Sequence, residues 1–216
     1  MSDRIIPKFQ KYFKNHSLLF TNDINPNDLE LQKEITILVN NAYAETFAHS
    51  YKEPSKYRRF EHEPKNVLPD SIKLLERFCL FDMANDGKLL GTVRLTTPIL
   101  CQNPSTKEYE LTTEMGLMAI HVDFKRRGYS NLMLNSCKDI FTKLKNDDQA
   151  HRLVLQLLRP GTSDDLPFDF LYRWYEKNGF VEIHRSDVAE SERYGALYSR
   201  ILKYKDNEFA DFEFRG

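Results

Sequence analysis

Apolar residues recur at helical spacing, three or four positions apart, in three stretches of the chain. The first stretch follows the turn Asn25-Pro26-Asn27, the second follows Gly128, and the third ends at Asn178-Gly179. The apolar faces consist, in order, of Leu31, Ile35, Leu38, Val39, Ala42 and Tyr43; of Leu132, Met133, Ser136, Cys137, Ile140, Phe141 and Leu144; and of Phe168, Leu171, Tyr172 and Tyr175. This spacing predicts three amphipathic helices, and a shorter helix is predicted over 70–77.

Short apolar and aromatic runs between these stretches predict strands. The runs 78–83 and 89–97 flank Asn85-Asp86-Gly87, a strong hairpin signal because Asp-Gly readily forms a tight turn between strands. Further strands are predicted over 16–24, 109–122, 153–158, 181–185 and 196–203, with 98–107 as a polar connection. The order of elements predicts an α/β (α+β) fold with a mixed, mostly antiparallel central sheet and helices on both faces.

No repeat or linker divides the 216 residues, so one folded domain is expected over 25–203. Residues 1–24 are expected to form an N-terminal extension with a possible first strand. The tail 204–216 alternates aromatic with acidic residues. It is expected to add a strand to a sheet edge or a subunit interface, or to be loosely ordered.

The charge balance and the cysteines narrow the classes of partner. The chain has 31 Lys and Arg against 32 Asp and Glu, whereas a nucleic-acid-binding protein typically has a basic surplus. The three cysteines are widely spaced and lack a CxxC pair, which argues against a disulfide scaffold and a thiolate zinc site. No signal peptide or membrane-length apolar run is visible. We therefore expect a cytoplasmic protein, with the nucleus not excluded, that is a monomer or homodimer and binds no metal, nucleic acid or membrane.

The segment from Glu114 to Leu134 carries the most chemical information. A hydrophobic strand leads into Lys125-Arg126-Arg127-Gly128-Tyr129-Ser130 and then directly into a helix. Exposed amides at a helix N-terminus, the positive end of the helix dipole and two adjacent arginines favour an anion such as a phosphate. Gly128 lets the backbone approach a ligand without a Cβ in the way. A solvated basic turn before a surface helix would also fit these residues.

This loop resembles the acetyl-CoA loop of the GNAT N-acetyltransferase superfamily. The usual pattern of that family is R/Q-x-x-G-x-G/A, from which Lys125 and Ser130 depart. Downstream, the run W-Y-E-K-N-G-F from Trp174 to Phe180 is similar to the family's F-Y-x-x-x-G-F helix end. The resemblance covers roughly 29–203. It implies an acetyl-CoA-dependent N-acetyltransferase whose acceptor is an amine.

The resemblance also implies how the co-substrate acetyl-CoA would be held. Its pyrophosphate would lie on the loop, and its pantetheine arm would pair with the main chain of Met118 and Ile120, whose side chains are expected in the core. The binding residues on the loop would be Lys125, Arg126, Arg127, Gly128, Tyr129 and Ser130.

Two side chains are candidates for proton transfer. Glu114 stands where several GNAT enzymes place the general base, which removes a proton from an ammonium with a pKa near ~10. Even-numbered positions of the strand are expected to share one face, with Glu114 further along than the pantetheine contacts. Tyr175 matches the family tyrosine that protonates the departing thiolate. A solvated glutamate and a core tyrosine are the structural alternatives, and His121 is a weaker candidate because it faces the other way.

The acceptor is expected to be chosen by two segments, 50–69 and 186–195. Their mixed charges leave a small amine, an amino-acid derivative and a peptide or protein amine open. Two alternatives to the enzyme remain. A non-catalytic acyl-CoA-binding domain would keep the loop but would need neither Glu114 nor Tyr175. An acyl-homoserine-lactone synthase has a similar length and a related fold.

Overall fold

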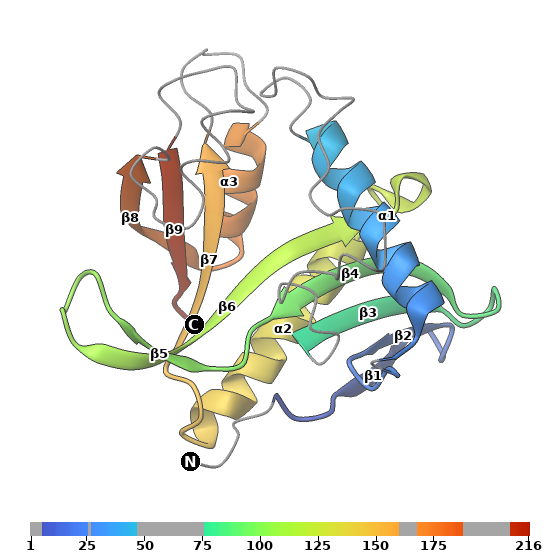
Figure 1. Ribbon diagram of the computed structural model, residues 1–216, viewed down its shortest axis with the longest axis horizontal. Coiled ribbons are helices and arrows are strands. Elements are labelled where there is room, and N and C mark those ends of the chain that lie inside the picture. The colour runs from blue at the N-terminus through green and yellow to red at the C-terminus, as the bar shows by residue number, and fades with distance from the viewer. Residues whose placement is uncertain (1–5, 26, 47–75, 160–167, 188–207) are drawn as a thin grey trace.

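A computed structural model describes residues 6–25, 27–46, 76–159, 168–187 and 208–216 (Figure 1). Within these ranges, the strands form one sheet in the order β1-β2-β3-β4-β6-β7-β9-β8, with β5 also beside β6. The strands are β1 Gln10–Phe13, β2 Leu18–Thr21, β3 Arg77–Asp82, β4 Lys88–Leu95, β5 Ile99–Gln102, β6 Tyr109–Ile120, β7 Arg152–Arg159, β8 Phe180–Asp187 and β9 Glu208–Phe214. The helices are α1 Leu29–Thr46, α2 Tyr129–Asn146 and α3 Phe168–Lys177.

The helices cover both faces of a mostly antiparallel sheet, as the sequence predicts. On one face, α2 and α3 pack on the larger core, to which they contribute Met133, Cys137, Ile140 and Tyr175. On the other face, α1 packs on a smaller core through Ile35, Leu38 and Val39. Only β6 and β7 run parallel to each other among the described strand pairs. None of the described helices is long and apolar enough to cross a membrane.

Two local signals in the sequence form the structures expected of them. Asp86 and Gly87 adopt positive φ angles of 51° and 71°, and the Lys88 amide donates to the Asn85 carbonyl at 3.0 Å, which closes a tight turn between β3 and β4. At the start of α1, an Asp28 carboxylate oxygen accepts from the Leu31 amide at 3.0 Å. This bond satisfies one of the free amides at the start of the helix.

Two predictions on the edges of the sheet were incomplete. The strand predicted over 16–24 is β2, and it pairs with an additional strand, β1. The segment 98–107, expected as a polar connection, contains β5. It pairs with β6 through Ile99↔Thr112 to Gln102↔Tyr109, because the long hairpin of β4 and β6 continues past Pro98.

The C-terminal segment, expected as a tail beyond the domain, instead supplies β9 inside the sheet. It lies between β7 and β8 and pairs antiparallel with both. Phe209, Ala210 and Phe212 are buried there, so this strand is part of the core. The predicted strand 196–203 lies outside the described residues. So does the predicted helix 70–77 apart from its last two residues, of which Arg77 begins β3.

The strands β6 and β7 separate near the middle of the sheet. They pair only at Thr112↔Arg152, Thr113↔Leu153 and Glu114↔Val154, although both strands continue beyond. Figure 1 shows them diverging from this point, with β7 turning toward α3 and β6 toward the start of α2. We call the space between the diverging strands the β6–β7 opening. It leaves one edge of β6 unpaired with β7 from Met115 onward.

Candidate functional site

The loop between β6 and α2 ends in a helix N-terminus that no side chain caps. Gly128 is the N-cap, with φ 82° and ψ 4°, and no side-chain hydrogen bond is made at this position. The first bond of the helix runs from the Leu132 amide to the Gly128 carbonyl at 3.1 Å. The preceding amides of the first turn have no partner within the helix. Such free amides are the chemical requirement for holding an anion at this end of α2, which follows the open part of β6.

Glycine is required at position 128 because of its backbone conformation and not because of crowding by neighbouring atoms. A Cβ at this position would meet no atom within 4 Å, but the φ of 82° is one that other residues rarely adopt. Arg126 also has a positive φ, of 62°. The two left-handed residues turn the chain sharply between the strand and the helix.

The cations of the loop have aromatic and acidic neighbours. Lys125 forms an ion pair with Glu45 at the end of α1, with Nζ and Oε2 2.6 Å apart, so its charge is partly compensated. The Arg127 guanidinium lies 5.1 Å from the centre of the Phe124 ring. Lys14 lies over the Tyr129 ring at 5.1 Å, which brings a cation from the β1–β2 turn to the same end of α2.

A β-bulge in β6 changes which residues share a face. The register with β4 shifts between Thr92 and Arg94, and Leu117 adopts a positive φ of 50°. A hydrogen bond stabilises this β-bulge, because the buried Arg77 side chain donates to the Leu117 carbonyl at 3.4 Å. The two hydrophobic cores show on which face each side chain of β6 lies. Met115, Met118 and Ile120 belong to the core under α2, whereas Leu117 and Ala119 belong to the core under α1.

The prediction that positions 114, 116, 118 and 120 share one face is therefore wrong. Strict alternation fails at the bulge, and Glu114 lies on the face opposite to Met118 and Ile120. The Met118 and Ile120 side chains pack against the larger core, as expected. Their main chain lies on the part of β6 that continues beyond the last pair with β7.

Glu114 lies at the point where β6 and β7 separate. It is the last residue of β6 that pairs with β7, and its side chain is half-buried. Its amide donates to the Thr96 hydroxyl at 2.9 Å, and its carbonyl accepts from the Thr96 amide at 2.9 Å. The backbone of Glu114 is thus fixed by Thr96, which follows β4, at the apex of the β6–β7 opening.

Tyr175 lies on α3, on the other face of the sheet from Glu114. Its side chain is 7% exposed and packs edge-on against Trp174 and Phe180, with ring centres 4.7 and 5.5 Å away. Burial raises the pKa of the Tyr175 phenol well above its usual value, and the nearby Tyr43 and Cys137 raise it further. Tyr43 belongs to α1, on the opposite face.

Glu114 and Tyr175 are not bonded to each other. No hydrogen bond or ring contact joins them in the part of the chain that the structure describes. Glu114 lies where β6 and β7 separate, whereas Tyr175 is buried in the larger core under α2 and α3. His121 has a local structural role instead, since its Nδ1 accepts from the Asp123 amide at 3.3 Å and caps the short 3₁₀ turn Val122–Phe124.

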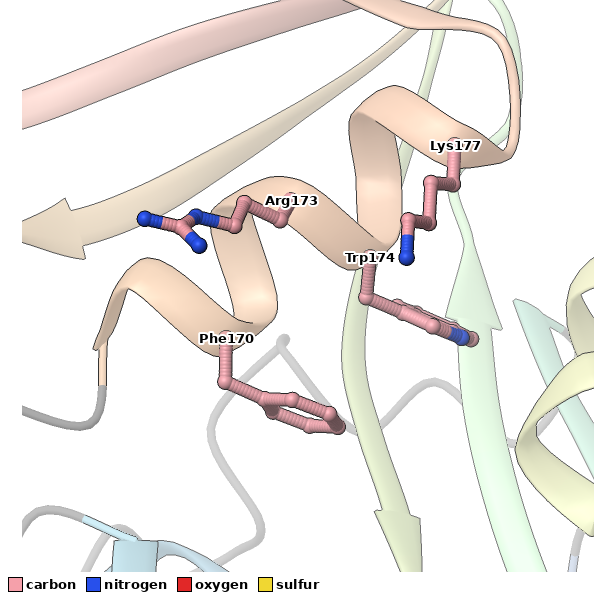
Figure 2. A pocket seen from close by; sticks show the side chains of 4 residues that line it. All are labelled: Phe170, Arg173, Trp174 and Lys177. Carbon is pink, nitrogen blue, oxygen red and sulfur yellow. The ribbon is translucent and has the colours of Figure 1, made fainter.

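A pocket of about 360 Å³ lies along α3, lined by Phe170, Arg173, Trp174 and Lys177 (Figure 2). The Trp174 indole N–H donates to the Asn131 side chain at 2.8 Å, which ties α3 to the first turn of α2. From the sequence, Trp174 was recognised only as part of the W-Y-E-K-N-G-F motif, and Phe170 was given no role. Their position on one helix face could have been found from the spacing of four residues.

The described part of the site holds no cluster of three or more metal-binding side chains. The segment 50–69, expected to select the acceptor, lies outside the described residues, and so does 188–195 of the second segment.

Solved acetyltransferase structures resemble this chain in fold. A spermidine N-acetyltransferase from Vibrio cholerae in complex with CoA and spermine is 16% identical, with a TM-score of 0.55 over 92% of this chain and 95% of that one. NAA60 from Arabidopsis thaliana, in complex with a bisubstrate analogue, is 14% identical, with a TM-score of 0.54 over 91% and 98%. An acetyltransferase of the GNAT family from Bacillus anthracis is 12% identical, with a TM-score of 0.53 over 95% and 97%.

The chain has the GNAT fold. No protein-family model and no curated protein matches the sequence. The likeness to GNAT structures therefore rests on the arrangement of the elements, and it extends over more than nine-tenths of the chain. Within the GNAT fold, the loop after β6, the open edge of β6 and the end of α3 meet around a single opening.

Proposed function

We propose that the protein is an acetyl-CoA-dependent N-acetyltransferase that transfers the acetyl group directly to an amine in a ternary complex. The observation that carries this proposal is the β6–β7 opening directly beside the uncapped N-terminus of α2. The GNAT fold supports it, since one of the similar structures holds CoA with an amine.

The residues present fit acetyl-CoA. The amides of Arg126 to Ser130 would bind the pyrophosphate, with Arg126 and Arg127 beside them. The main chain of Met118 and Ile120 would pair with the pantetheine arm along the open edge of β6. Lys125 would contribute less, because Glu45 already compensates its charge. Bound acetyl-CoA would supply an activated thioester at the apex of the opening.

Glu114 would act as the general base. Glu114 lies at the apex, on the face opposite to the Met118 and Ile120 side chains, so its carboxylate would meet an amine that enters from the other side of the sheet. There it would accept the ammonium proton directly or through one water molecule, which leaves a neutral amine free to attack. The two hydrogen bonds between its main chain and Thr96 would fix the strand position of the base.

Tyr175 would act as the general acid. Because burial raises the pKa of its phenol, the hydroxyl stays protonated across the physiological range and can hold a proton for the departing sulfur. Transfer would occur only as negative charge develops on the sulfur. Trp174 and Phe180 would fix the ring direction.

The test is a screen of amine acceptors that measures the release of free CoA from acetyl-CoA. The panel should contain polyamines, amino acids and peptides with free N-termini, since the similar structures include a spermidine N-acetyltransferase. We expect release with at least one amine and loss of that release in Glu114→Gln. Acetylation of alcohols or thiols alone would contradict the role of Glu114. Binding of acetyl-CoA without turnover of any amine would favour a non-catalytic acyl-CoA-binding domain.

A further inference from the structure

A buried cation reaches the bulge of β6 from two strands away. Arg77 begins β3, and its side chain is fully buried. Its guanidinium donates to the Leu117 carbonyl at 3.4 Å, although β4 lies between β3 and β6 in the sheet. Burial lowers the pKa of Arg77 to about 10, so the side chain stays cationic at neutral pH. A charged guanidinium is unfavourable in a protein core unless polar groups compensate it, so its bond to the Leu117 carbonyl matters to this part of the core.

The residue that accepts this bond has an unfavourable backbone conformation. Leu117 has a φ of 50°, a left-handed conformation that a leucine adopts only when its surroundings impose it. The register between β4 and β6 shifts at the same place, so that Leu117 and Met118 stand against Val93 alone. The bond from Arg77 comes from outside the β4–β6 ladder, and it is therefore an independent interaction that holds the bulge.

The carbonyl that Arg77 holds belongs to the peptide group that also contains the Met118 amide. No peptide bond among the described residues is cis, so the N–H of this planar group points in the direction opposite to its C=O. The C=O is directed to a side chain from β3, and β3 and β7 lie on opposite sides of β6 in the strand order. The Met118 N–H is therefore directed away from the Arg77 guanidinium.

We propose that Arg77 is a positioning residue for acetyl-CoA, which fixes the β6 bulge and so directs the Met118 amide to the open edge of β6. The pantetheine arm would pair with the main chain at this edge, and the inference rests on the proposed function for the identity of the ligand. Arg77 would not touch the ligand, because it acts through the peptide group of Leu117 and Met118. Its loss should weaken the binding of the arm and leave the binding of the nucleotide end unchanged.

Two substitutions of Arg77 test this role. Arg77→Met removes the donor and the charge, and it keeps an unbranched side chain that adapts to an apolar core. Arg77→Lys keeps the charge and a donor but lacks the planar fork of the guanidinium. The control is Leu80→Ala, which removes a fully buried side chain of the same strand from the larger core. It should lower the melting temperature through the other face of the sheet, so it separates general destabilisation from the specific effect.

Each folded variant is titrated calorimetrically with CoA and with 3′-phosphoadenosine 5′-diphosphate, the fragment of CoA that lacks the pantetheine arm. The ratio of the two Kd values isolates the contribution of the arm. Arg77→Met should raise the Kd of CoA about fivefold, the effect of one lost hydrogen bond, and leave that of the fragment unchanged. Arg77→Lys should raise the Kd of CoA by a smaller factor, about two- to threefold. Leu80→Ala should leave the ratio unchanged.

Hydrogen exchange of the amides over 115–120 is a second measurement, which needs no ligand. These amides should exchange faster in Arg77→Met than in Leu80→Ala, once the rates are corrected for the difference in stability. If Arg77→Met does not fold, the same comparison is made with Arg77→Lys. Equal corrected rates, or an unchanged ratio of Kd values in the Arg77 variants that fold, would overturn the proposal.

The failure of this proposal differs from the failure of the proposed function. If CoA binds but its Kd changes no more than that of the fragment, the co-substrate site stands and Arg77 is only part of the core. If CoA binds with the expected ratios but no amine is acetylated, the proposal is upheld and the proposed activity fails. If CoA does not bind the unaltered protein, the proposed function fails, whereas faster exchange over 115–120 would still uphold the role of Arg77 in the bulge.

Discussion

Glu114 and Tyr175 are proposed to transfer protons in opposite directions. Glu114 must lose its proton to act as a base, and Tyr175 must keep its proton to act as an acid. The half-buried position of Glu114 and the full burial of Tyr175 suit these tasks, because burial disfavours the charged form of a phenol. Substitutions that remove one ionisable group without changing its volume should therefore give defects of different kinds.

For Glu114→Gln, we expect kcat to fall by about 10²- to 10⁴-fold at neutral pH, because the amide cannot accept the amine proton. The loss should shrink as pH rises, since more of the acceptor is then neutral in solution. Initial rates from pH 6 to pH 9 measure this. The control is Glu108→Gln, which makes the same change at an exposed carboxylate directly before β6. An unchanged rate in Glu114→Gln across this range would assign the base to another group.

For Tyr175→Phe, we expect the Kd of acetyl-CoA to hold while kcat falls by about 10²-fold or more, because only the hydroxyl is removed. The raised pKa of Tyr175 means that the hydroxyl is protonated at every pH from 7 to 9, so the defect should be the same throughout. An acyl donor with a less basic thiol should relieve it. Tyr172→Phe removes a hydroxyl from the same helix and should keep kcat, whereas equal losses in both variants would indicate a packing effect.

For Gly128→Ala, we expect a loss of stability of about 1–2 kcal/mol and a weaker affinity for acetyl-CoA, because alanine disfavours the left-handed backbone of the loop. Gly87→Ala is a matched control, since Gly87 also has a positive φ and open space around it but lies in a remote turn. It should lose similar stability and bind acetyl-CoA normally. Thermal melts and binding titrations separate the two effects, and equal affinities in both variants would contradict the role of the loop.

At the scale of elements, periodicity predicted most helices and strands, because their buried faces repeat at the spacing of their own backbone. The bulge in β6 escaped prediction for a specific reason. Residues 115–120 are apolar or glycine at both odd and even positions, so the pattern contains no sign of the inserted residue. The hydrogen bond from Arg77 to the Leu117 carbonyl depends on a contact over 40 positions of sequence, which local patterns do not encode.

The position of β9 escaped prediction for a related reason, because its acidic and aromatic residues also suit an exposed tail. In the structure, β9 is the only link between β7 and β8 among the described strands. Truncation after residue 207 should therefore abolish cooperative unfolding, whereas removal of Gly216 alone should not. Thermal melts followed by circular dichroism measure this. A truncated chain that still melts cooperatively would show that the fold forms without β9.

At the scale of the whole molecule, the sheet is two pieces joined at a short parallel contact. One piece contains β1 to β6 and the other contains β7 to β9, and they share only three residue pairs between β6 and β7. The opening beyond these pairs brings together groups from both faces and from α1, α2 and α3. The uncapped N-terminus of α2 follows the open part of β6, and Glu114 lies at the apex of the opening. This arrangement is the physical basis of the proposed acetyl transfer.

The change in melting temperature on addition of acetyl-CoA tests this account most directly. A ligand that binds only the folded chain, at about 100 times its Kd, stabilises it by about 2.7 kcal/mol. For a chain of this size, that corresponds to a rise of roughly 5–11 °C. We predict such a rise with acetyl-CoA and with CoA, and its loss in Gly128→Val. An unchanged melting temperature with either ligand at millimolar concentration would contradict the assignment of the opening as an acetyl-CoA site.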